Sequence, residues 1–233
     1  MQLSPTAIRW LALASIPGGV LLVLAWAIPA ISLLPNIFAP DVRTVAGPTA
    51  DLALLSTWFT LGFALLFAVV VLAIAKAARV SWVGATGAVL YATGALFLSV
   101  EAIFAIASPV TILPWHFLFV PTLLSLGAVL FGVAAFRSGA LPRGAALLLA
   151  FIQPTALFGV AGPQAGMALF GTDFGLGGST LLMMYGYVGM FGVAAAWMWL
   201  GYAAWKRSAV AATGAAPASA RIAAAATGTR GSA

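Results

Sequence analysis

Six long apolar stretches dominate this chain of 233 residues and restrict what it can fold into. A helix needs about 20 apolar residues, at a rise of about 1.5 Å each, to cross a hydrocarbon layer of about 30 Å. The stretches that reach or approach this length are residues 8–34, 52–75, 80–107, 115–136, 145–162 and 178–205. They predict an all-α membrane protein whose residues 1–207 form a bundle of six transmembrane helices.

The composition supports a bilayer as the main solvent and partner of the chain. Hydrophobic residues make up 64% of the sequence and charged residues only 6%, whereas a soluble domain carries about 25% charged residues. So few charges cannot hydrate a surface of this size, but they can occupy the loops of a bundle. The net charge of +6 does not indicate nucleic-acid binding, because no basic patch is interleaved with aromatic residues.

The basic residues predict the orientation. In a six-span arrangement, nine of the ten lysines and arginines fall on one side, and only Arg43 falls on the other. Basic residues concentrate in cytoplasmic loops, so we expect a multi-pass protein of the cell membrane with both termini in the cytoplasm. The nine residues are Arg9, Lys76, Arg79, Arg137, Arg143, Lys206, Arg207, Arg221 and Arg230.

A second interpretation of the first span stays open. Arg9, the following apolar run and Ala25-Trp26-Ala27 also resemble a signal peptide with a small-residue cleavage site. The apolar run is longer than the roughly 7–15 residues of such a peptide, which favours a membrane span. Cleavage would leave five spans and keep every later loop on its predicted side.

Residues 208–233 differ in composition from the rest of the chain. They are mostly Ala, Gly, Ser, Thr and Pro, with almost no large apolar side chain to bury. Such a segment cannot offset the entropy lost on ordering. We therefore predict a disordered, low-complexity cytoplasmic tail after residue 207.

Glu101 is the one acidic residue inside a predicted span. It continues a helical stripe with spacings of four, three, four and three residues, and glycines in that stripe mark a face where another backbone approaches. The stripe consists of Gly87, Tyr91, Gly94, Leu98 and Glu101. Glu101 is predicted to face protein, either as a proton, cation or ligand site or as a carboxyl that joins two helices.

Two further residues, His116 and Gln153, belong to the candidate polar site, and a third, Pro17, affects the geometry of the first span. His116 begins the fourth span, where it could meet Glu101 as a proton relay or simply contact water at the interface. Gln153 precedes Pro154 near the middle of the fifth span, and it could bond across helices or to the backbone that proline frees. Pro17, followed by two glycines, predicts a break in the first span.

Small residues line part of the sixth span. Gly186, Gly189, Gly192 and Ala196 predict a surface for close helix packing, but only Gly192 and Ala196 have the four-residue spacing of a straight groove. Packing within the chain is the first expectation. Association with a second copy or with another membrane protein is the alternative.

Several chemistries are excluded by residue type. Without cysteine and with a single histidine, one chain cannot form a disulfide, a thiolate metal site, a bis-histidine haem site or a histidine-rich zinc site. Both lysines lie at span ends, so neither could hold retinal in mid-membrane. No nucleophile–base set and no phosphate-binding glycine loop occurs. We therefore expect no cofactor, no metal and no enzymatic activity.

Two functional classes remain from the sequence. The first expectation is a non-enzymatic accessory or scaffold subunit that packs through its glycine-rich helix faces. The alternative is a small-solute or proton-coupled transporter or channel, with Glu101 as its polar site together with Gln153 or His116. Scarcity of charge favours the first class, because ion-coupled transport usually uses several polar groups within the spans.

The orientation can be tested with a reporter joined after Ala233. A reporter that is active only in the cytoplasm should work there, because an even number of spans returns the chain to the side of its N-terminus. Activity of an alkaline phosphatase fusion at the same point, which requires export, would contradict the predicted topology.

Overall fold

Seven helices and no strand make up the part of the chain that the computed structural model describes, residues 4–38, 49–107, 116–170 and 176–212. For some residues at helix ends only the backbone is described. The helices are α1 (Pro5–Leu13), α2 (Ser15–Phe38), α3 (Ala50–Ala78), α4 (Trp82–Ala107), α5 (His116–Ser138), α6 (Arg143–Phe170) and α7 (Leu176–Ala212). Because α1 and α2 together form one candidate span, the fold is a bundle with six candidate membrane spans.

Each predicted apolar stretch corresponds to a helix long and apolar enough to cross a membrane. This confirms the prediction of an all-helical, multi-pass chain with six candidate spans. The fifth stretch, the shortest in the sequence, also qualifies. The spans are Pro5–Ser32, Ala50–Ala78, Trp82–Ala107, Phe119–Ser138, Arg143–Pro163 and Leu182–Ala209.

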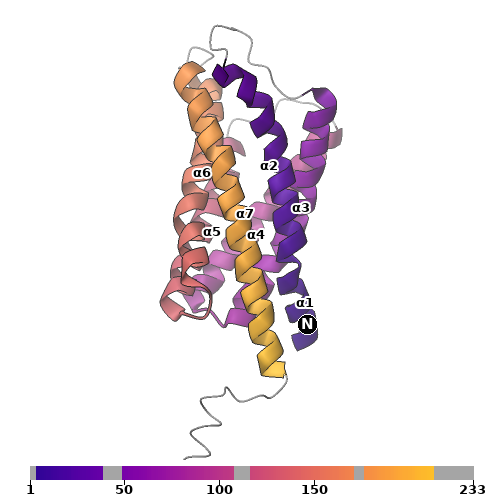
Figure 1. Cartoon of the computed structure of the whole chain (residues 1–233), viewed down its shortest axis with the longest axis vertical. Helices are drawn as coiled ribbons and strands as arrows, with labels where there is room; N and C mark the ends of the chain where they lie inside the picture. Colours follow the sequence, from indigo (N-terminus) through magenta and orange to yellow (C-terminus); the bar gives the residue numbers. More distant parts are fainter. Residues whose placement is uncertain (1–3, 39–48, 108–115, 171–175, 213–233) are drawn as a thin grey trace, which may run out of the picture.

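The six spans form a closed ring in chain order. Each of α2 to α7 packs against its neighbours in sequence, and α7 closes the ring by packing against α2 (Figure 1). Short turns at α3–α4 and α5–α6 force these neighbours to run antiparallel. Across the ring, Phe67 of α3 meets Trp197 of α7, with ring centroids 5.3 Å apart.

The first span is interrupted at Ala14, between α1 and α2. Proline lacks an N–H group, so Pro17 cannot bond to the carbonyl of Leu13, four residues earlier. The helix therefore breaks before the proline and continues through the two glycines that follow it. The break is packed on α7, because a Cβ atom added to Gly201 would overlap Ser15.

Helix α1 begins and helix α7 ends at the same end of the bundle (Figure 1). The described basic residues lie in the helix ends and turns at this end, namely Arg9, Lys76, Arg79, Arg137, Arg143, Lys206 and Arg207. The guanidinium of Arg9 lies 4.8 Å from the centre of the Trp205 ring. Arg207 donates a hydrogen bond of 2.8 Å to the carbonyl of Ala140 in the α5–α6 turn. The two turns at this end each use a left-handed residue, Arg79 with φ 51° and Gly139 with φ 61°. We call this the basic end and the other the opposite end.

Glycines allow close contact between α4 and α5. A Cβ atom added to Gly87 would lie 2.5 Å from the backbone nitrogen of Phe131, and one added to Gly127 would lie 2.6 Å from that of Tyr91. One added to Gly94 would lie 3.0 Å from Leu124. The glycine stripe of α4 is thus covered by α5 of the same chain.

Helix α7 extends through Ala212, beyond the predicted end of the membrane domain at residue 207. In this last part, the hydroxyl of Ser208 donates to the carbonyl of Ala204 at 2.9 Å. The helix therefore continues past the last basic pair, Lys206 and Arg207. The rest of the predicted tail, residues 213–233, lies outside the described residues.

Because α4 and α5 are in close contact, we expect a single methyl group added between them to destabilise the protein. Gly87→Ala should lower the free energy of unfolding by about 1–3 kcal/mol, because backbone atoms of α5 must move. Gly144→Ala in α6 is the control, because its Cβ atom would meet only the Trp199 ring at 3.7 Å. Unfolding of both variants in detergent micelles gives the comparison. Equal stabilities would show that the α4–α5 contact tolerates a methyl group.

Candidate functional site

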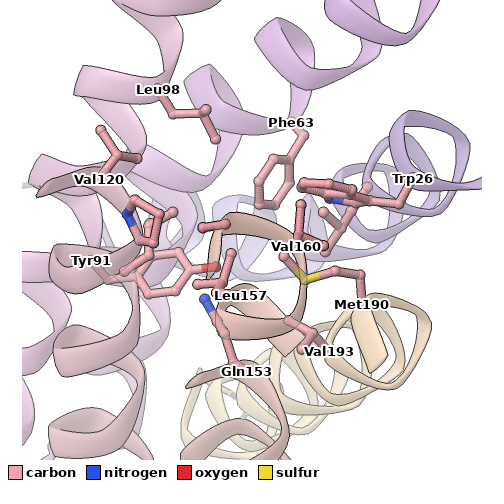
Figure 2. A pocket seen from close by; sticks show the side chains of 14 residues that line it. Trp26, Phe63, Tyr91, Leu98, Val120, Gln153, Leu157, Val160, Met190 and Val193 are labelled. Atoms are coloured by element: carbon pink, nitrogen blue, oxygen red, sulfur yellow. The ribbon is translucent and has the colours of Figure 1, made fainter. Parts of the chain in front are cut away.

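Three polar side chains from three helices meet in the centre of the bundle. Tyr91 of α4, Gln153 of α6 and Trp197 of α7 are each at most 1% exposed. The indole nitrogen of Trp197 donates to the Tyr91 hydroxyl at 3.1 Å. The Gln153 side chain is also hydrogen-bonded to that hydroxyl, with its amide nitrogen toward the oxygen (Figure 2). Of the two interactions expected for Gln153, the one across helices is present.

The hydrogen-bonding capacity of this cluster is not fully used. A tyrosine hydroxyl has one hydrogen and two lone pairs, and here it accepts from two N–H groups, so its hydrogen is left to donate. The Oε1 atom of Gln153 is buried and has no hydrogen-bond donor among the described residues. The cluster therefore contains one donor and one acceptor that have no partner among the described residues.

Aromatic rings hold the cluster in place. The Trp197 ring contacts Tyr91 edge-on with centroids 4.9 Å apart and stacks on Phe131 of α5 at 5.7 Å. Phe67 of α3 contacts both Tyr91 and Trp197, and all four side chains are almost fully buried. We call Phe67, Tyr91, Phe131 and Trp197 the aromatic layer. It fills the middle of the ring and fixes the position of the Tyr91 hydroxyl.

A central cavity of about 100 Å³ lies against the aromatic layer. Its lining is apolar apart from the Tyr91 and Gln153 side chains and the indole of Trp26 (Figure 2). On the helices that contribute to the layer, the lining residues other than Tyr91 lie on its side toward the opposite end, as Leu98 does. All six spans contribute, through Leu22, Trp26, Phe63, Tyr91, Leu98, Val120, Pro121, Leu124, Gln153, Leu157, Val160, Ala161, Met190 and Val193.

The basic half of the bundle is packed with apolar side chains. Val70, Val71, Ile74, Leu149 and Leu200 are all 0% exposed, and they lie between the aromatic layer and the basic end. This packing closes the basic side of the central cavity. Within the described helices, the structure thus has a packed half and a half that contains a cavity.

Glu101 lies apart from the cluster of Tyr91 and Gln153. It is half-buried on the same face of α4, ten residues beyond Tyr91, which is about 15 Å along a helix. It lies one turn beyond Leu98 and is not part of the cavity wall. His116 begins α5, but its side chain lies outside the described part of the structure, and so does any contact it makes with Glu101.

The small residues of the sixth span pack within the chain. A Cβ atom added to Gly189 would lie 2.7 Å from that of Ala156, and one added to Gly192 would lie 3.6 Å from Ile152, both in α6. Ala196 is fully buried. Together with Gly87 and Gly94, these positions face neighbouring helices of the same chain.

Sequence reasoning missed Trp197, which anchors the cluster. Tryptophans that anchor a span are exposed near its ends, as Trp82 is with 80% exposure. Depth does not separate Trp197 from Trp199, which lies two residues further along α7 and is 51% exposed. Trp197 differs from Trp199 in the face of α7 that it occupies, because it points into the bundle and is fully buried. A buried indole usually bonds through its N–H group, and Tyr91, already singled out, was an available acceptor.

The arrangement offers hydrogen bonding and apolar contact as its chemistry. No group of three or more His, Cys, Asp or Glu side chains able to hold a metal ion occurs among the described residues. No protein-family model matches the chain, and neither does any curated protein or solved structure compared with it. The site's own geometry therefore carries the functional argument.

Tyr91 accepts two hydrogen bonds in the cluster, whereas Gln153 also carries an oxygen without a donor among the described residues, so we expect their mutation to lower stability by different amounts. Tyr91→Phe should destabilise the protein by about 1–3 kcal/mol, because Trp197 and Gln153 lose their acceptor inside the bundle. Gln153→Leu should stay within about 1 kcal/mol of the original, because it also removes a buried oxygen that has no donor.

Thermal unfolding in nanodiscs measures both variants. Tyr187→Phe is the matched control, at a second buried tyrosine, whose ring packs on Trp26 at 5.6 Å. A larger loss for Gln153→Leu than for Tyr91→Phe would show that Gln153 is a structural element of the bundle.

Proposed function

We propose that this protein is a non-enzymatic membrane protein that binds a small neutral molecule in the central cavity. The observation that carries the proposal is the Gln153 oxygen, buried beside an apolar cavity without a donor among the described residues. A buried acceptor without a donor is costly, and a bound molecule with a hydroxyl or amide group would supply one. The Tyr91 hydroxyl, whose hydrogen is free to donate, would bond to the same group.

The cavity volume restricts the ligand. An apolar cavity of about 150 Å³ accommodates benzene, so a cavity of about 100 Å³ suits a smaller molecule. The apolar walls provide no counter-charge, which disfavours ions. The ligand class is therefore a short alcohol, amide or similar molecule with one polar group and a small apolar part.

A carrier role is the second candidate, supported by the asymmetry of the bundle. One half is packed and the other contains the cavity, as expected of one state of an alternating-access carrier. Glu101, one turn beyond the cavity wall, would then lie on the path to the opposite end. Glu101→Gln should leave ligand affinity unchanged and reduce flux into vesicles.

The structure gives less support to the accessory or scaffold role, in which glycine-rich helix faces would pack against another protein, than to ligand binding. The glycines named for it pack against helices of the same chain, so a second protein would have to meet a different surface. We also propose that the basic end is cytoplasmic and that the membrane is the cell membrane. This proposal rests on the collection of basic residues at one end.

Binding can be tested with 2,2,2-trifluoroethanol, a fluorinated alcohol of suitable size, followed by fluorine NMR in nanodiscs. The original protein should show saturable binding. Tyr91→Phe and Gln153→Leu should each weaken it about two- to tenfold, because each removes one hydrogen bond of about 0.5–1.5 kcal/mol.

Tyr185→Phe is the control, because the Tyr185 hydroxyl bonds to Thr155 at 3.0 Å on the exposed surface of α6 and α7. It should bind the alcohol like the original protein. Absence of saturable binding, or equal affinity in all variants, would contradict the proposed function.

A further inference from the structure

A groove between α5 and α6 lies beside the central cavity. It has a volume of about 420 Å³, and its rim includes Leu126 and Phe158, which are 46% and 66% exposed. In a bundle surrounded by lipid, large apolar side chains this exposed face the hydrocarbon. The groove is therefore open to the interior of the bilayer. We call it the α5–α6 groove.

The groove and the central cavity share part of their walls. Pro121 of α5 and Ala161 of α6 line both spaces. These two side chains thus lie between the groove and the ligand site. One of them is an alanine, whose methyl group leaves little material between the two spaces.

Glycine contacts explain why this opening lies between α5 and α6. Nearer the basic end these helices touch closely, because a Cβ atom added to Gly132 would lie 2.6 Å from the carbonyl oxygen of Ala146. Near the groove, the glycine of α6 is Gly162, and its Cβ atom would meet only the ring of Phe158, at 3.5 Å. The helices are therefore in close contact toward one end and separated toward the other.

At the level of the groove, α6 is in close contact with its other neighbour, α7. A Cβ atom added to Gly159 would lie 2.8 Å from the carbonyl oxygen of Leu182 in α7. Both helices that form the groove also contain a proline there, Pro121 and Pro154. Each proline removes one backbone hydrogen bond, which allows the helix to bend at that point.

We propose that the ligand of the central cavity passes between the bilayer interior and the cavity through the α5–α6 groove, by displacement of Pro121 and Ala161. This inference rests on the proposed function, since it supplies the route to that site. A small molecule with one polar group partitions into lipid. Lateral passage needs no opening of the packed basic half.

The test follows the exchange of 2,2,2-trifluoroethanol with the protein in phosphatidylcholine nanodiscs by fluorine NMR. Gly162→Leu places a side chain in the groove, away from the hydrogen-bonding cluster. A blocked route raises the barrier between bound and free states without changing their free energies. Association and dissociation should therefore both slow, by about tenfold, while the affinity stays within about twofold.

Gly144→Leu is the matched control, because it makes the same replacement in α6 at the basic end, where only the Trp199 ring is near. It should leave both rates unchanged. Ser125→Phe blocks the groove from α5 and should slow exchange as Gly162→Leu does. Because the two substitutions are on different helices, agreement between them shows that the slower exchange is not caused by a folding defect in one variant.

The outcomes separate the two proposals. If the original protein shows no saturable binding, the proposed function is wrong and the route with it. If it binds, and both groove variants exchange the alcohol at the original rates, the cavity is a ligand site but lateral passage is wrong. A loss of affinity without slower exchange in the groove variants would also overturn the route.

Discussion

Contact between the first and last spans holds the ring of helices closed. It depends on small residues, because Cβ atoms added to Gly19 or Gly201 would overlap Met198 or Ser15 on the facing helix. In lipid, apolar side chains gain little by leaving their solvent, so close van der Waals packing between helices is a main source of association. A wider separation of α2 and α7 would open the wall of the cavity at Leu22 and Trp26 and release Trp197 from its neighbours.

The aromatic layer determines how the interior of the ring is divided. Six helices in a ring leave a central space that small residues cannot fill, and four large rings occupy it at one level. Branched apolar residues fill the basic side. On the other side Leu98, Val120 and Val160 are too short to meet in the middle, and the cavity remains there.

Much of the fold could be predicted from the sequence, and less of the site. The length and charge of the apolar stretches determine the number of spans, because both follow from the thickness and polarity of the bilayer. Gln153 and Tyr91 could be selected as buried polar groups within apolar spans. That they meet could not be predicted, because it depends on the rotation of α4 and α6 about their axes, which many weak contacts set together. Trp197 was missed for the same reason. Glu101 was selected by its charge and its helical stripe, and neither indicates how far the cavity extends along α4.

The turn between α3 and α4 shows how a local cost can serve the whole chain. Arg79 adopts φ 51°, a left-handed conformation that costs a residue with a Cβ atom about 1–2 kcal/mol, whereas the corresponding turn after α5 uses Gly139. Glycine at position 79 would relieve that cost but remove a positive charge from a short turn. Under the proposed topology, arginine here gives up some stability of the finished fold in return for correct insertion. The residue is thus understood through the biogenesis of the protein, when each helical hairpin takes its orientation, rather than through the folded state.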